Sequence, residues 1–144
     1  MIAVRYYKAS PCPLSQPFVE QVVGQAARHE KKICGSVEIT MVNETTIKKL
    51  NREHRGKNSA TDVLSFPWKE SGSKESFLGE LFICYPYIVR QAKRFNMSTR
   101  EEFVRMLAHG LLHLVGHDHV KSTEASKMFN LQEKIVSDSL KKYK

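Results

Sequence analysis

The spacing of apolar residues along the chain predicts a succession of strands and helices. Val37, Ile39 and Met41 alternate with polar residues, as in a strand that buries one face. Between Phe18 and Ala27 the apolar residues recur every three or four positions, as along one face of a helix. Such patterns predict strands at about residues 2–8, 36–42, 61–66 and 78–84. They predict helices at about residues 16–31, 44–54, 86–95, 99–115 and 123–141.

The order of these elements predicts an α+β fold. Strands and helices alternate first and three helices follow, so we expect a mixed, four-stranded sheet covered by helices. The helix at 99–115 is apolar on nearly every side and should lie in the core. The polar insert at 69–76 is too short to divide domains and should link two neighbouring strands. Residues 1–144 are therefore expected to form a single domain. The last helix should bury Ala125, Met128, Phe129, Ile135, Val136 and Leu140.

Charge and cysteine content narrow the class of protein. Twenty-three basic and fifteen acidic side chains give a net charge of +8, which suits a nucleic acid or another polyanion. The alternative is that the source organism makes lysine-rich, basic proteins in general, in which case the net charge indicates no particular partner. Three widely spaced cysteines, Cys12, Cys34 and Cys84, are typical of reduced thiols and not of a disulfide framework. No apolar run approaches the ~20 residues of a membrane span, so we expect a soluble, cytoplasmic protein with no membrane partner.

Four of the six histidines lie within residues 109–119. His109 and His113 are four apart, so on a helix their imidazoles project from one face. Gly116 can adopt the left-handed conformation that ends a helix, and this turn would bring His119 round as a third ligand. Three neutral imidazoles with one position left open are typical of a catalytic zinc site. Nitrogen ligands also suit nickel, copper or iron.

The same segment departs from the zinc peptidases at one position. Its histidine and glycine spacing matches the metzincin signature H-E-x-x-H-x-x-G-x-x-H, but Gly110 stands where that signature has glutamate. In those proteases the glutamate is the general base. Its absence disfavours peptide hydrolysis. Hydrolysis or group transfer in which a bound metal ion supplies most of the activation is still compatible with the sequence.

Four stretches of the chain together resemble one protein family. HGLLHLVGHDH, residues 109–119, resembles the H-G-x-L-H-L-x-G-Y-D-H signature of the bacterial YbeY proteins, endoribonucleases that act in ribosomal RNA maturation. Residues 61–67 match the family's T-D-V-L-S-F-P block, and residues 78–83 its L-G-[DE]-[IL]-x-I strand. Residues 50–51 with residues 55–57 resemble its L-N-x-x-[FY]-R-x-K segment.

This resemblance implies a zincin-like core in which one zinc ion is held by His109, His113 and His119. It implies a single-strand-specific endoribonuclease that acts in maturation of the small-subunit rRNA 3′ end and in ribosome quality control. Single-stranded RNA, the ribosome or ribosomal proteins would be its partners. The resemblance also carries Arg55 over as a catalytic residue that faces the phosphate, and a guanidinium fork suits a phosphodiester. Whether water or the RNA 2′-hydroxyl is the nucleophile stays open.

Several residues near these motifs have more than one interpretation. His54 and His117 replace aromatic residues of the family pattern. We assign the third ligand to His119 and place His117 in the site wall, because two histidines so close in sequence cannot easily reach one ion. Asp118 would either orient a ligand imidazole or cap the following turn. Asp62 and Glu80 are not assigned catalytic roles.

Two other classes of function remain as alternatives. A non-catalytic ribosome assembly factor stabilised by zinc would explain the charge and the motifs equally well. An open fourth metal position disfavours it, since structural zinc sites are usually closed. A metzincin-like metallopeptidase would explain the histidines, but neither Gly110 nor the positive charge. Oligomeric state is not indicated by the sequence.

Overall fold

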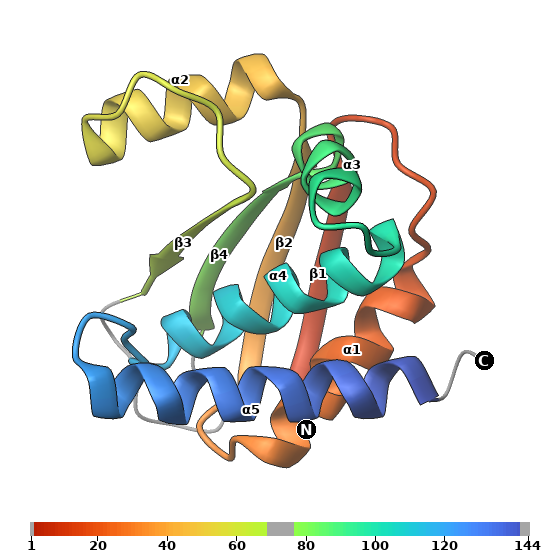
Figure 1. The fold of residues 1–144 in the computed structure, drawn as a ribbon, viewed down its shortest axis with the longest axis vertical. Coiled ribbons are helices and arrows are strands. Elements are labelled where there is room, and N and C mark those ends of the chain that lie inside the picture. The colour runs from red at the N-terminus through yellow and green to blue at the C-terminus, as the bar shows by residue number, and fades with distance from the viewer. Residues whose placement is uncertain (1, 69–76, 142–144) are drawn as a thin grey trace.

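A mixed four-stranded sheet organises the part of the chain that the computed structural model describes, residues 2–68 and 77–141. The strands are β1 (Ile2–Lys8), β2 (Gly35–Val42), β3 (Val63–Pro67) and β4 (Phe77–Cys84). Their order in the sheet is β1-β2-β4-β3, as Figure 1 shows. β2 pairs in parallel with both β1 and β4, whereas the edge strand β3 runs antiparallel to β4. The predicted α+β fold with a mixed four-stranded sheet is confirmed.

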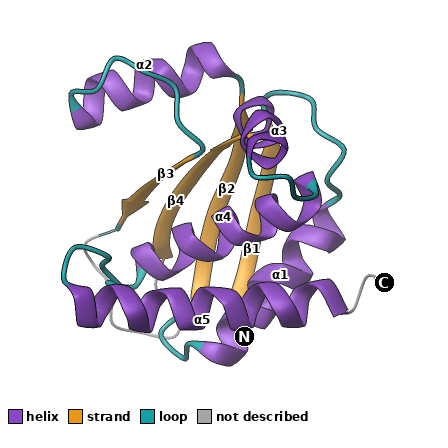
Figure 2. Ribbon diagram, in the orientation of Figure 1, coloured by secondary structure: helices purple, strands orange, loops and turns teal. Residues whose placement is uncertain are grey.

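Helices cover both faces of this sheet. They are α1 (Gln16–His29), α2 (Glu44–Arg55), α3 (Tyr85–Arg94), α4 (Thr99–Leu114) and α5 (Ser122–Lys141). Residues of α1, α4 and α5 share one buried cluster with Ile39, Leu81 and Ile83 of the sheet (Figure 2). Successive strand residues point to opposite faces, so Leu64 and Cys84 pack instead with Ile47 of α2. None of the described helices is long and apolar enough to cross a membrane.

Polar side chains fix where the helices begin. The side chains of Ser15, Asn43 and Ser98 each accept a hydrogen bond from a backbone N–H three residues on, which satisfies one of the free donors of a helix start. At the start of α4 the Glu101 N–H donates to Ser98 Oγ at 3.1 Å, while the Glu101 carboxylate pairs with Arg105. The Ser98 cap thus fixes where the histidine-bearing helix α4 begins.

The sequence-based boundaries need small corrections. β3 begins at Val63, not at residue 61, because the Asp62 carboxylate accepts a hydrogen bond from the Val63 N–H in a turn before the strand. In α5, Phe129 was predicted to be buried but is 59% exposed. Its neighbour Met128 takes the inward position, and adjacent residues on a helix point about 100° apart. The insert predicted at 69–76 lies outside the described residues.

One glycine is required by the β3–β4 pairing. Gly79 has φ +141°, and a Cβ atom there would collide with the carbonyl oxygen of Phe66 and approach a methyl group of Leu114 to 3.0 Å. We therefore expect Gly79→Ala to destabilise the fold by about 2 kcal/mol or more, lowering the melting temperature by several degrees.

Gly24→Ala is the matched control for this substitution. Gly24 lies inside α1 with nothing within 4 Å of an added Cβ, so alanine there should stabilise by about 0.5–1 kcal/mol through helix propensity. Thermal denaturation followed by circular dichroism compares the two variants. Equal melting temperatures would show that the β3–β4 approach tolerates a side chain.

Candidate metal site in a histidine-lined cleft

The end of α4 brings three histidines together. His109 and His113 lie one turn apart on the helix face that is not covered by the core. The helix then ends in a turn in which the N–H of Gly116 donates to the carbonyl of His113 at 3.1 Å. Gly116 has φ +97°, a conformation that favours glycine. The chain reverses there, and His119 returns to the other two imidazoles.

The spacing of the imidazole nitrogens fits one metal ion. His113 Nε2 lies 3.1 Å from His109 Nε2 and 3.2 Å from His119 Nδ1. One nitrogen from each ring lies within 4.8 Å of the other two. Ligand distances of about 2.0–2.1 Å in a tetrahedral site imply nitrogen separations of roughly 3.3 Å. The three residues predicted as ligands could therefore hold an ion such as zinc.

Burial keeps the central histidine neutral. Together with charge repulsion from the neighbouring His109 and His119, burial lowers the pKa of His113 to about 4. Because a metal binds the neutral imidazole, His113 offers a lone pair at neutral pH without first losing a proton.

Close packing explains why no glutamate follows the first histidine. Gly110 is buried where α4 meets the sheet, and a Cβ there would lie 3.0 Å from Leu81 Cδ2 and 3.3 Å from Val63 Cγ2. A glutamate at position 110 would have to push its side chain into this helix–sheet contact. The position that bears the general base in metzincins thus serves here to bring α4 against β3 and β4.

The histidines lie in a cleft of about 720 Å³, within the range typical of small-molecule sites. Its wall includes Asn51, Arg55, Lys57, Thr61, Asp62, Val63, Leu64, Ser65, Pro67, Met106, His109, His113 and His119. The cationic side chains of Arg55 and Lys57 therefore line the same cavity as the three imidazoles. Asp62 also borders it, but its carboxylate already accepts hydrogen bonds from Val63 N–H, Thr61 Oγ1 and Gln91 Nε2.

Arg55 is the last residue of α2, one residue beyond the helix end predicted at about residue 54. Its Nη2 donates to the carbonyl oxygen of Ser65 at 2.6 Å, and its guanidinium carbon is 5.3 Å from the centre of the Phe66 ring. The hydrogen bond and the cation–π contact hold the side chain against β3. The guanidinium has five N–H donors, so one bond to Ser65 leaves donors for an anion.

Two neighbours of His119 have structural contacts of their own. His117 does not line the histidine cleft, so its predicted place in the site wall is wrong. Its Nε2 donates to Glu30 Oε2 at 2.5 Å in a separate hollow beside Lys32. Because the chain reverses at Gly116, His117 and His119 line different cavities. Asp118 accepts a hydrogen bond from Val120 N–H at 3.0 Å, the turn-capping alternative considered for it.

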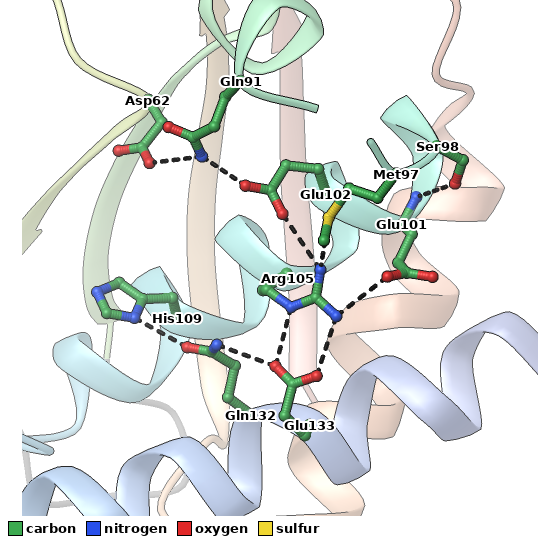
Figure 3. Close-up of polar contacts among 10 residues, drawn as sticks. All are labelled: Asp62, Gln91, Met97, Ser98, Glu101, Glu102, Arg105, His109, Gln132 and Glu133. Atoms are coloured by element: carbon green, nitrogen blue, oxygen red, sulfur yellow. Dashed lines mark hydrogen bonds and ion pairs between the residues drawn. The ribbon is translucent and has the colours of Figure 1, made fainter. Parts of the chain in front are cut away.

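Sequence reasoning missed the residue that orients His109. Gln132 of α5 is buried, and its Oε1 accepts a hydrogen bond from His109 Nδ1–H at 2.9 Å (Figure 3). Its Nε2 donates to Glu133 Oε2, which fixes which end of the amide faces the imidazole. A neutral His109 with its proton on Nδ1 must present the Nε2 lone pair to the cleft. No local pattern in the sequence indicates this contact across 23 residues.

A chain of ion pairs and hydrogen bonds stands behind this amide. Glu133 binds Arg105 through two hydrogen bonds of 2.9 Å, and Arg105 also contacts Glu101 and Glu102 (Figure 3). The Arg105 contact lowers the pKa of Glu133, so this carboxylate stays ionised and remains an acceptor for Gln132. Gln91 links Glu102 to Asp62 at the other side of the cleft. The polar network therefore joins α3, α4 and α5 beneath the histidines.

A helix that carries two histidines a turn apart, a glycine turn and a third histidine, packed on a mixed sheet, defines a zincin-like α+β protein. The family model described as "Endoribonuclease YbeY" matches residues 12–139, and the chain belongs to this family. The predicted family resemblance is confirmed.

Individual relatives agree with this assignment. A protein from Persephonella marina named "Endoribonuclease YbeY" is 40% identical over 128 residues, which cover 87% of this chain and 84% of the relative. One of the same name from Halalkalibacterium halodurans is 34% identical over 134 residues, covering 85% and 84%. The solution structure of TM1509 from Thermotoga maritima is 28% identical, with a TM-score of 0.69, and the match covers 97% of this chain and 91% of that one.

The role of Gln132 generates a prediction about metal affinity. Gln132→Leu removes the acceptor for His109 Nδ1–H while keeping the side-chain size, and we expect a ten- to hundredfold weaker affinity for zinc. Competition with a chromogenic chelator measures this change. Gln25→Leu is the control, because Gln25 is similarly buried on α1 and lies outside the histidine cleft. Equal affinities in the two variants would mean that Gln132 does not orient the ligand.

Proposed function

We propose that the protein is a metal-dependent endoribonuclease that cleaves single-stranded RNA. The observation that carries this proposal is the meeting of three histidines and Arg55 in one cleft of a chain whose relatives are named endoribonucleases. A metal site alone would fit many hydrolases. An arginine on the opposite wall adds a group suited to phosphate, and the net charge of +8 suits an RNA substrate.

The finer parts of the proposal concern the metal and the biological role. We propose one zinc ion, held by His109, His113 and His119, because three neutral imidazoles at these separations suit it. We propose that residues 1–144 act as one domain in the cytoplasm. The substrate there would be ribosomal RNA, at the small-subunit 3′ end, with ribosome quality control as part of the role. The ribosome or ribosomal proteins would be its partners.

The mechanism divides the work between two walls of the cleft. Zinc, when bound, supplies Lewis acidity that lowers the pKa of water to about 7 and polarises a phosphoryl oxygen. Arg55 binds the phosphodiester and neutralises the charge that develops on it during cleavage. The contacts with Ser65 and Phe66 hold the guanidinium in place before RNA arrives, so less ordering is needed on binding. Lys57 adds positive charge to the same cavity.

Two alternatives are less well supported. Peptide hydrolysis would require a general base, and Gly110 occupies its usual position inside a tight helix–sheet contact. A non-catalytic assembly factor would use the metal as a structural staple. The cleft is open to ligands beside the three nitrogens, whereas structural zinc sites usually have four protein ligands.

Cleavage of a single-stranded oligoribonucleotide by highly purified protein tests the proposed function. We expect cleavage that a chelator abolishes, that added zinc restores and that His113→Ala lacks. The termini distinguish the nucleophile, because attack by the RNA 2′-hydroxyl leaves a cyclic phosphate and attack by water does not. RNA that stays intact with fully metal-loaded protein would refute the nuclease and favour the assembly factor.

A second prediction separates Arg55 from the metal ligands. Arg55→Ala should reduce cleavage about ten- to a thousandfold, the loss typical of removing one charge-stabilising donor, and leave zinc content unchanged. Arg55→Lys should recover only part of the rate, since an ammonium lacks the planar fork. The control is Arg52→Ala, an exposed arginine one turn earlier on α2 that does not line the cleft. Wild-type cleavage by Arg55→Ala would assign this residue to the ordinary solvated surface.

A further inference from the structure

A second hollow lies beside the edge strand β3, next to the histidine cleft. It measures about 290 Å³ and is formed mainly by aromatic and apolar side chains. Its wall comprises Leu50, His54, Phe66, Pro67, Trp68, Phe77, Glu80 and Phe82. None of these residues is one of the three histidines, and the mechanism above uses only Phe66, whose ring contacts Arg55.

Two pairs of neighbouring rings line this hollow. His54 meets Phe66 edge-on, with ring centres 5.0 Å apart, and Trp68 lies 5.8 Å from Phe77 in a tilted arrangement. Trp68 is 53% exposed although tryptophan has a large apolar surface. Exposed aromatic rings at the edge of a basic protein are the usual stacking surfaces for single-stranded nucleic acid.

The hollow and the histidine cleft border the same strand, β3. Successive residues of the strand point to opposite faces of the sheet, and Pro67 borders both cavities. Arg55 spans the division, because its guanidinium donates to Ser65 and lies over the Phe66 ring. β3 is an edge strand of the described sheet, and the end of α2 reaches it through the Arg55–Ser65 hydrogen bond and the His54–Phe66 ring contact. The two cavities therefore meet at Pro67 and Arg55.

We infer that the aromatic hollow binds an unpaired RNA base adjacent to the phosphate held by Arg55. This inference rests on the proposed function and extends it to the recognition of single strands. A base in a duplex is stacked and paired, so it cannot enter the hollow without leaving the helix. Glu80 complements this occupant: its carboxylate accepts hydrogen bonds from the N–H groups of a base edge and repels a phosphate. The base enters the hollow while its phosphate stays with Arg55.

Trp68 makes this binding directly observable, because it is the only tryptophan in the chain. Stopped-flow mixing of the intact protein with a single-stranded oligoribonucleotide should give saturable quenching of tryptophan fluorescence before the RNA is consumed. The same sequence in a duplex should not quench. An oligoribonucleotide with an abasic position next to the scissile phosphate should bind more weakly, which tests the base without altering the protein.

Substitution of Trp68 gives the matching test on the protein. Trp68→Ala should weaken affinity for the single strand about five- to a hundredfold, the effect of losing one stacked base, and Trp68→Phe should recover part of it. The loss should appear in KM, with zinc content and melting temperature unchanged. The control is Phe95→Ala, another exposed aromatic residue that lines neither cavity.

The outcomes separate this inference from the proposed function. RNA binding without quenching, or equal affinities for Trp68→Ala and Phe95→Ala, would overturn the base site and leave the hollow to a protein partner. Quenching that depends on an unpaired base, without any cleavage, would support the base site while refuting the nuclease. Cleavage that is indifferent to Trp68 would support the nuclease and overturn only the base site.

Discussion

The burial of α4 is the constraint on which the rest of the structure depends. Its glycine lies directly on the sheet, and α5 covers another of its sides, so only one stripe of the helix remains for polar groups. Imidazoles on such a helix lose free energy of hydration unless each finds a partner. Gln132 satisfies Nδ1 of His109, and one nitrogen from each of the three imidazoles lies within 4.8 Å of the other two. Because α4 packs closely against the sheet and α5, its polar stripe is the part of the helix where a metal ion can be bound.

The same packing places a buried arginine among carboxylates. Arg105 has only 17% of its side chain exposed, and Glu102 only 4%. Burying either charge alone would cost several kcal/mol, so each depends on the other and on Glu133 for compensation. This ion network stabilises the fold less than its number of contacts suggests, because desolvation offsets most of the attraction. Its larger effect is geometric, since it fixes α5 against α4 and thereby fixes the amide that orients His109.

Local periodicity explains how much could be predicted from the sequence. The element order, the sheet of four strands and the pairing of His109 with His113 follow from spacings of two and four residues, and these were predicted correctly. Contacts between distant segments carry no such signal. The bond from Gln132 to His109 and the bond from Arg55 to Ser65 depend on how α5 and α2 pack, and they became visible only in the structure. His117 was misplaced because the turn at Gly116, and not residue spacing, decides its direction.

The two walls of the cleft differ in how they are supported, and this difference matters for catalysis. His109 and His113 project from a helix that is held by the core and by the ion network, whereas His119 is exposed in the turn that follows this helix. Arg55 lies at the exposed end of α2, which packs on the sheet through a small cluster around Ile47. Contacts with the edge strand β3 fix its guanidinium. The core therefore positions the first two metal ligands, whereas the position of Arg55 depends on how the end of α2 packs against the edge strand β3.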